Sequence, residues 1–171
     1  MLKFGLVSIA ALGCIVLLAS GAALGSGGKP GASYSGTGKD YMNNAPRWAA
    51  EATGQFSYRV SASGREITNF HGGFSYYCGG GKSFVSAKSI AISPSGSFSY
   101  RFSLANIVNG KSYGRNYVSI VGSFVGKGAA ASIAYLFDSV STNAPVSDPY
   151  DTAHPHRLGC ASWVKGIAHA Q

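Results

Sequence analysis

A nine-residue segment near the C-terminus holds the densest group of side chains that could do chemistry: residues 148–156 read DPYDTAHPH. Carboxylates and imidazoles are ligands for zinc and other divalent cations. In an extended segment the two imidazoles of a His-x-His sequence can converge, and Pro155 restricts the chain between them. The candidate metal ligands are Asp148, Asp151, His154 and His156. The alternative is a polar loop without a metal, and the sequence leaves both interpretations open.

A second motif, GKSYG at 110–114, satisfies the G-x-S-x-G pattern of a hydrolase, with Ser112 as nucleophile. Acids and histidines follow it in the chain order that such enzymes use. That chemistry requires a strained strand-to-helix turn, a fixed base and a preorganised oxyanion site. Here the motif falls in an expected hairpin between strands. We therefore assign no catalytic residue, and a secreted hydrolase using Ser112 or the His154/His156 loop is kept as an alternative.

The elements that must position these residues are strands. Two nearly identical phrases, GQFSYRVS at 54–61 and GSFSYRFS at 96–103, alternate aromatic with polar residues, which is typical of half-buried antiparallel strands. Further strands are expected at 72–78, 90–92, 117–125, 129–137 and 160–167, with turns at 93–96, 109–110 and 126–128. The sequence predicts an all-β fold, an antiparallel β-sandwich or small barrel of about seven or eight strands.

The repeated phrase places Arg59 and Arg101 at equivalent positions on the polar face. Like charges directly opposite each other destabilise a sheet. Either the two strands are not paired in that register, which we favour, or an anion lies between the guanidinium groups. The alternation of inward and outward positions along the expected strands also places three tyrosine rings on the outer face, where they could contact a sugar. The candidate ligand-binding residues are Arg59, Arg101, Tyr77, Tyr113 and Tyr117.

The N-terminal residues predict export. A basic start, an apolar run at 4–18 and small residues at 19–23 describe a secretory signal peptide at 1–23, with an uncleaved anchor as the alternative. Residues 24–45 are rich in glycine and lack apolar periodicity, which predicts a flexible linker. Residues 46–171 then form one β domain. We expect a secreted protein, outside the cell or in the cell envelope.

Removal of the signal peptide leaves two cysteines, Cys78 and Cys160. In an exported chain such a pair predicts a disulfide. A metal site is the alternative, although neither cysteine has a CxxC neighbour.

Charge indicates the class of partner. Lysine and arginine number 14 against six acids, a formal net charge of +8. A basic exported protein is attracted to anionic polymers such as acidic polysaccharide or phosphate-bearing wall components. We do not expect specific nucleic-acid binding, because the aromatic residues alternate onto the face assigned to the core. We expect no cofactor, and no membrane association after signal cleavage.

The order of strands and turns resembles a group of small exported bacterial β-sandwich proteins of uncharacterised function. The resemblance covers roughly residues 54–165 and rests on these segments: GREITNF at 64–70, glycines around Cys78, IAISPSGSFS at 90–99, NGK at 109–111, VSIVGSF at 118–124 and GCASW at 159–163. It implies a sandwich with a Cys78–Cys160 bridge and brings no catalytic residues. Residues 139–158 form an insertion relative to that pattern.

These observations predict a secreted, non-enzymatic module that binds a glycan or an anionic polymer at the cell surface or in the extracellular matrix. A structural domain of the envelope without a small ligand is a further alternative.

Overall fold

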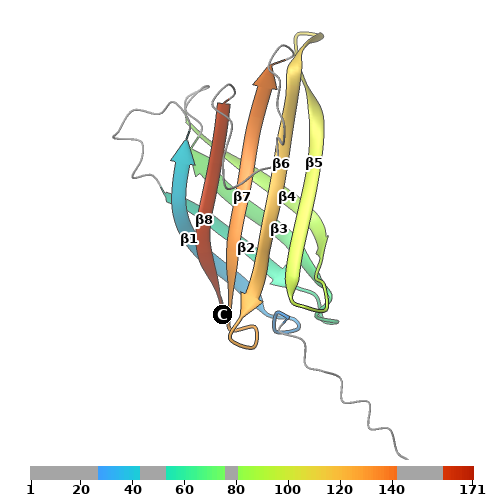
Figure 1. Ribbon diagram of the computed structural model, residues 1–171, viewed down its shortest axis with the longest axis vertical. Helices are drawn as coiled ribbons and strands as arrows, with labels where there is room; N and C mark the ends of the chain where they lie inside the picture. The colour runs from blue at the N-terminus through green and yellow to red at the C-terminus, as the bar shows by residue number, and fades with distance from the viewer. Residues whose placement is uncertain (1–26, 43–52, 76–80, 142–159) are drawn as a thin grey trace, which may run out of the picture.

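The computed structural model describes residues 27–42, 53–75, 81–141 and 160–171, and in this part of the chain the secondary structure is all β (Figure 1). The eight strands are β1 (Ser33–Met42), β2 (Thr53–Val60), β3 (Glu66–Ser75), β4 (Lys82–Ala91), β5 (Ser97–Val108), β6 (Lys111–Val125), β7 (Ala130–Ser141) and β8 (Cys160–Ala170). Among the described residues, no helix has the length and apolar character needed to cross a bilayer.

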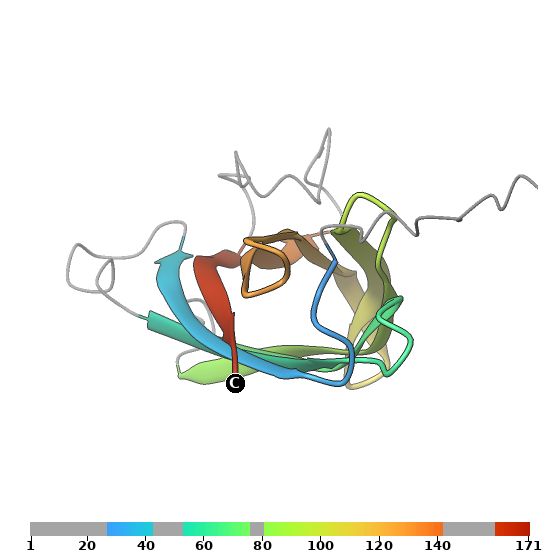
Figure 2. The ribbon, with the colours of Figure 1, turned by 90° about the horizontal axis from the view of Figure 1, so that it is seen from below.

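The eight strands form one antiparallel sheet in the order β4-β3-β2-β1-β8-β7-β6-β5. Every strand except β4 and β5 pairs with its neighbours in sequence, and β1 also pairs with β8, so the sheet curls into a nearly closed barrel with β4 and β5 as its two edges (Figure 2). Between β4 and β5 only an isolated bridge, Ile92 with Phe98, joins the two edges. The all-β prediction is confirmed. The strands belong to a single barrel-like sheet, the second of the two predicted architectures, rather than to the two sheets of a sandwich.

The first strand corrects the predicted domain boundaries. The segment 24–45 was expected to be a linker, yet Ser33–Met42 is β1 and pairs with both β2 and β8. Its inward positions after Tyr34 include Gly36 and Gly38, which give no apolar alternation to detect. A Cβ at Gly38 would lie 2.5 Å from the Lys165 carbonyl oxygen, so the lack of a side chain permits the close approach of β8.

Aromatic rings fill the barrel. Tyr34 and Tyr58 stack with centroids 5.0 Å apart and an interplanar angle of 4°, and Phe124 packs edge-on against both. Phe56 and Tyr58 from the first repeated phrase are buried, as is Phe98 from the second. The later rings of the second phrase are only half-buried, since β5 is at the open edge. The phrase is therefore a structural device that turns rings inward and polar groups outward.

Because the strands alternate in direction, four connections lie at one end of the barrel: β1–β2, β3–β4, β5–β6 and β7–β8. We call this the β5–β6 end. The chain positions 43–52, 76–80 and 142–159 belong to three of these connections and lie outside the described residues.

Candidate functional site

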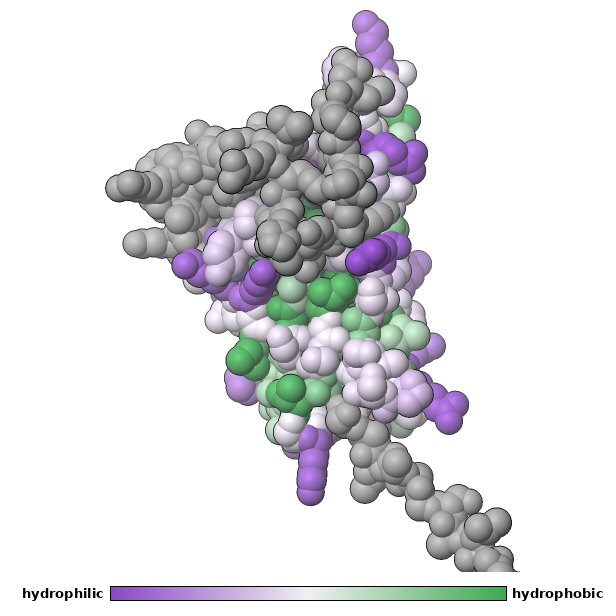
Figure 3. Space-filling view, in the orientation of Figure 1, coloured by the Kyte–Doolittle hydropathy of each residue, from purple (hydrophilic) through white to green (hydrophobic). Residues whose placement is uncertain are grey.

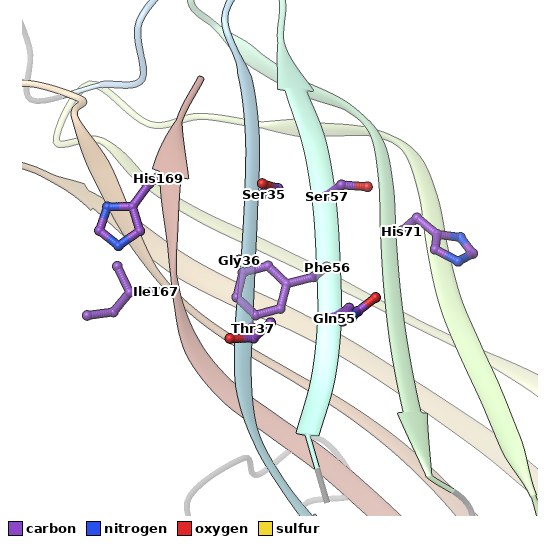
Figure 4. Close-up of a pocket in the computed structure, with 9 residues that line it drawn as sticks. All are labelled: Ser35, Gly36, Thr37, Gln55, Phe56, Ser57, His71, Ile167 and His169. Carbon is purple, nitrogen blue, oxygen red and sulfur yellow. The ribbon is translucent and has the colours of Figure 1, made fainter.

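A groove with a volume of about 760 Å³ crosses the outer face of β8, β1, β2 and β3 (Figure 4). One row across these strands is set by the register His169–Ser35–Ser57–His71. Its two histidines stand at opposite sides of the groove, three strand spacings or about 14 Å apart. The groove therefore has an imidazole at each side and short hydroxyl side chains between them.

The second row of the groove holds Ile167, Thr37 and Gln55. Hydroxyl and amide groups on the floor can donate and accept hydrogen bonds from a hydroxylated ligand. Beside the two histidines, Ile167 lines the groove on β8 and is 53% exposed. Outside the groove lining, Phe84 of β4 is 61% exposed and stacks on His71 with ring centroids 4.9 Å apart. The groove thus offers hydrogen-bonding groups on its floor and one exposed apolar side chain, Ile167, at its β8 side.

Cations flank the groove along the strands. Arg59 lies two positions after Ser57 on β2, and its Nε donates a hydrogen bond of 3.1 Å to the Gly31 carbonyl oxygen. On the other side, Lys39 of β1 lies directly opposite Lys165 of β8, and both side chains are exposed. The groove thus lies between one guanidinium group and two ammonium groups.

The next outward-facing pair along β1 and β8 consists of two aromatic residues. Tyr41 and Trp163 stack with centroids 5.4 Å apart and an interplanar angle of 10°. The Lys39 Nζ atom lies 5.3 Å from the centroid of the Tyr41 ring, within the range of a cation–π contact. This contact holds the Lys39 ammonium on the outer face without neutralising its charge.

Exposed charge in the described residues is almost entirely positive. Eleven lysines and arginines are exposed: Lys29, Lys39, Arg59, Arg65, Lys82, Lys88, Arg101, Lys111, Arg115, Lys127 and Lys165. Of the three described acids, Asp40 and Asp138 are fully buried, which leaves Glu66 as the one exposed carboxylate in these residues. The hydrophilic side chains are spread over the face shown in Figure 3, so the attraction to anions is broad as well as local.

Inside the barrel, near its β5–β6 end, Asp40 anchors a small polar cluster. The Ser75 backbone N–H donates a 2.6 Å hydrogen bond to Asp40 Oδ2, whereas Oδ1 has no hydrogen-bond partner among the described residues. Burial raises the pKa of the Asp40 carboxyl, and the bond from Ser75 only partly opposes this. The Tyr135 hydroxyl donates to the Gly73 carbonyl, and its pKa is raised by burial and by the nearby Asp40. The Ser162 hydroxyl donates to the Ser75 carbonyl. The cluster thus ties β3 to β7 and β8 across the interior, and its burial separates it from any substrate in the groove.

The predicted ligand-binding residues are distributed over the barrel. The strands β2 and β5 are not neighbours in the sheet, so Arg59 does not face Arg101, and the favoured interpretation is confirmed. Arg59 borders the groove, whereas Arg101 is on β5 opposite Ser119. Tyr113 is exposed and Tyr117 half-buried on β6, away from the groove.

The remaining candidates give no site within the described residues. Ser112 is on β6 opposite Ile107, next to the expected hairpin, and β6 continues as a strand where a hydrolase elbow needs a helix. The described residues contain no group of three or more His, Cys, Asp or Glu side chains able to hold a metal. Tyr77, Cys78, Asp148, Asp151, His154 and His156 lie outside the described residues, so the metal hypothesis stays a prediction.

Sequence reasoning missed most of the groove for two reasons. Ser35 and Thr37 fell in the segment interpreted as a linker, and Gln55 and Ser57 were seen only as the solvated side of a strand. The alternation of Ser35, Thr37, Lys39 and Tyr41 with buried positions was the available signal, but glycines at Gly36 and Gly38 concealed it.

Comparison with models of protein families, with curated proteins and with solved structures gives no match to this chain. The interpretation of the groove therefore rests on its own geometry and charge.

Proposed function

We propose that this protein is a secreted, non-enzymatic β module that binds an anionic polymer at the cell surface or in the extracellular matrix. The observation that carries the proposal is the imbalance of eleven exposed cations against one exposed carboxylate in the described residues. Such a surface attracts polyanions and accelerates their association. A module for neutral glycans has no need of that imbalance.

Retention on dextran sulfate and on uncharged dextran tests this proposal, because the two polymers share a backbone and differ in charge. We expect retention on dextran sulfate alone, with release as salt rises from about 0.1 to 1 M and the Debye length falls from about 10 to 3 Å. A basic protein of equal net charge serves as the control and should elute at lower salt. Equal, salt-insensitive retention on both polymers would indicate stacking on neutral sugar instead. Retention on neither would favour a structural domain of the envelope.

Export and the Cys78–Cys160 disulfide belong to the same proposal. The Ser162 hydroxyl lies 2.7 Å from the Ser75 carbonyl oxygen, so strands β3 and β8 are held together at the β5–β6 end. Cys78 is three residues beyond Ser75, and Cys160 is two residues before Ser162. Three residues reach at most about 10 Å, which suits the roughly 4.4–6.8 Å separation of Cα atoms in a disulfide. Mass spectrometry of the exported protein, before and after reduction, tests the bridge and gives the mature N-terminus.

A further inference from the structure

We propose, on the basis of the function proposed above, that Lys39 and Lys165 form the anion-binding point of an acidic-polysaccharide site whose sugar chain lies in the adjacent groove. The ligand is a polymer of sugars that carry carboxylate or sulfate groups. The oxyanion lies between the two ammonium groups, and the sugar hydroxyls meet the hydroxyl and amide side chains of the groove floor.

The pairing of Lys39 with Lys165 favours a bound anion. Lys39 and Lys165 are directly opposite each other on adjacent strands, where like charges repel and weaken the sheet. The one exposed carboxylate of the described residues is that of Glu66, at the start of β3 and at the other end of the barrel, where it cannot neutralise them. A bound oxyanion would remove the repulsion and gain two charge-assisted hydrogen bonds.

The lysine pair lies next to the groove along β1 and β8. Along β1 and β8 the outward pairs are Ser35 with His169, Thr37 with Ile167, and Lys39 with Lys165. Successive pairs are about 7 Å apart, because two residues of an antiparallel strand span that distance. The lysine pair therefore adjoins the last row of the groove.

The strand register distinguishes Lys39 and Lys165 from the other exposed cations. Lys88 on β4 and Lys111 at the start of β6 are exposed as well, but neither lies opposite a second lysine in the strand register. If the whole surface acted as a diffuse charge, these lysines would contribute as much as the paired ones. This difference gives a matched control with the same loss of charge.

The ligand is a saccharide rather than a nucleic acid because of the aromatic residues next to the lysines. The rings of Tyr41 and Trp163 stack on each other, so their facing sides are not free for a base. Single-strand nucleic-acid platforms offer successive free ring faces to bases. The groove floor offers hydroxyl groups instead, through Ser35, Thr37 and Ser57.

The experiment compares Lys39→Gln/Lys165→Gln with Lys88→Gln/Lys111→Gln, using polygalacturonate and dextran sulfate as probes in calorimetric titrations. We expect the groove-side double variant to lose about tenfold or more in affinity for at least one polymer, since charge-assisted contacts are lost. The control double variant should lose less than about threefold. The polymer that responds distinguishes a carboxylate from a sulfate ligand. Ser57→Tyr, which fills the groove floor without changing charge, should also weaken binding.

Thermal unfolding without ligand provides a second measurement. The groove-side double variant should be at least as stable as the wild type, because substitution relieves the repulsion, so its loss of binding is not a loss of fold. Equal losses of affinity in both double variants, unchanged binding in Ser57→Tyr, or a groove-side variant that is less stable than wild type would overturn this inference. Those outcomes leave the proposed function intact, whereas wild-type protein that binds neither polymer refutes the proposed function itself.

Discussion

The substitution Tyr58→Phe removes one atom from the centre of the barrel and should stabilise the protein. The Tyr58 ring is 3% exposed and stacks on Tyr34, with Phe70 and Phe124 around it. Within the part of the chain that the structure describes, its hydroxyl has no hydrogen-bond partner. Burial and the neighbouring Tyr34 raise the pKa of this hydroxyl, so it stays a neutral, unsatisfied polar group.

The magnitude follows from the cost of burying such a group. An unsatisfied buried donor or acceptor costs about 1–3 kcal/mol, and phenylalanine keeps every ring contact. We therefore expect Tyr58→Phe to raise the free energy of unfolding by about 1–3 kcal/mol. In a domain of this size, 1 kcal/mol corresponds to a shift of roughly 2–8 °C in Tm.

The same chemical change at Tyr135 is the matched control. The Tyr135 hydroxyl donates to the Gly73 carbonyl, so Tyr135→Phe leaves that part-buried acceptor without this partner. We expect this variant to lose about 1–3 kcal/mol, opposite in sign to the change at Tyr58.

Urea unfolding followed by far-ultraviolet circular dichroism measures both variants, and an unchanged m-value shows that the shift in midpoint is a change in stability. If Tyr58→Phe destabilises the protein as much as Tyr135→Phe does, the two hydroxyls do not differ in hydrogen bonding and the reasoning fails.

Three further predictions concern the interior and the cysteines. Burial raises the pKa of Asp40 above its unfolded value of 3.8, so above that pH the folded state holds a proton that the unfolded chain releases. The free energy of unfolding therefore falls as pH rises from 3.8 towards the folded pKa. Asp40→Asn should therefore gain on the wild type in urea midpoints as pH rises above about 3.8; the opposite trend would contradict the stated effect of burial. A Cβ at Gly54 would lie 2.5 Å from Val164 Cγ2 and 2.6 Å from the Gly73 carbonyl oxygen, so Gly54→Ala should lower the free energy of unfolding by about 1–3 kcal/mol. The control Gly73→Ala should be tolerated, because a Cβ there would lie 3.6 Å from its nearest neighbour. Cys78→Ser should lose about 4–5 kcal/mol in thermal or urea unfolding, and a reductant should bring the wild type to the same value; two free thiols in the exported wild type would refute the bridge.

Much of the fold could be predicted from local sequence because its causes are local. The alternation at Phe56 and Tyr58 places rings on one side of a strand whatever that strand pairs with. The hairpin at Asn109-Gly110 has φ values of 49° and 75°, which asparagine and glycine adopt most readily. The turn before β7 likewise uses positive φ at Gly126 and Gly128, so composition indicated both turns correctly.

The site could not be predicted in this way. The local pattern around Lys39 resembles a linker because the strand faces the core with glycines. Lys165 lies on the polar side of a strand far away in the chain, where a single exposed lysine is unremarkable. Only the β1–β8 register places the two ammonium groups opposite each other and joins the histidines, hydroxyls and Arg59 around one groove.

The sequence by itself determined the strand class, most turns, the inward rings and the basic surface, since each depends on residues adjacent in the chain or on composition alone. The tertiary structure decided that eight strands form one nearly closed barrel rather than two sheets, and that β1 is part of it. The first strand pairs with the last, and such a contact depends on how all the intervening strands curl. The groove and its lysine pair exist only once β1 and β8 are paired.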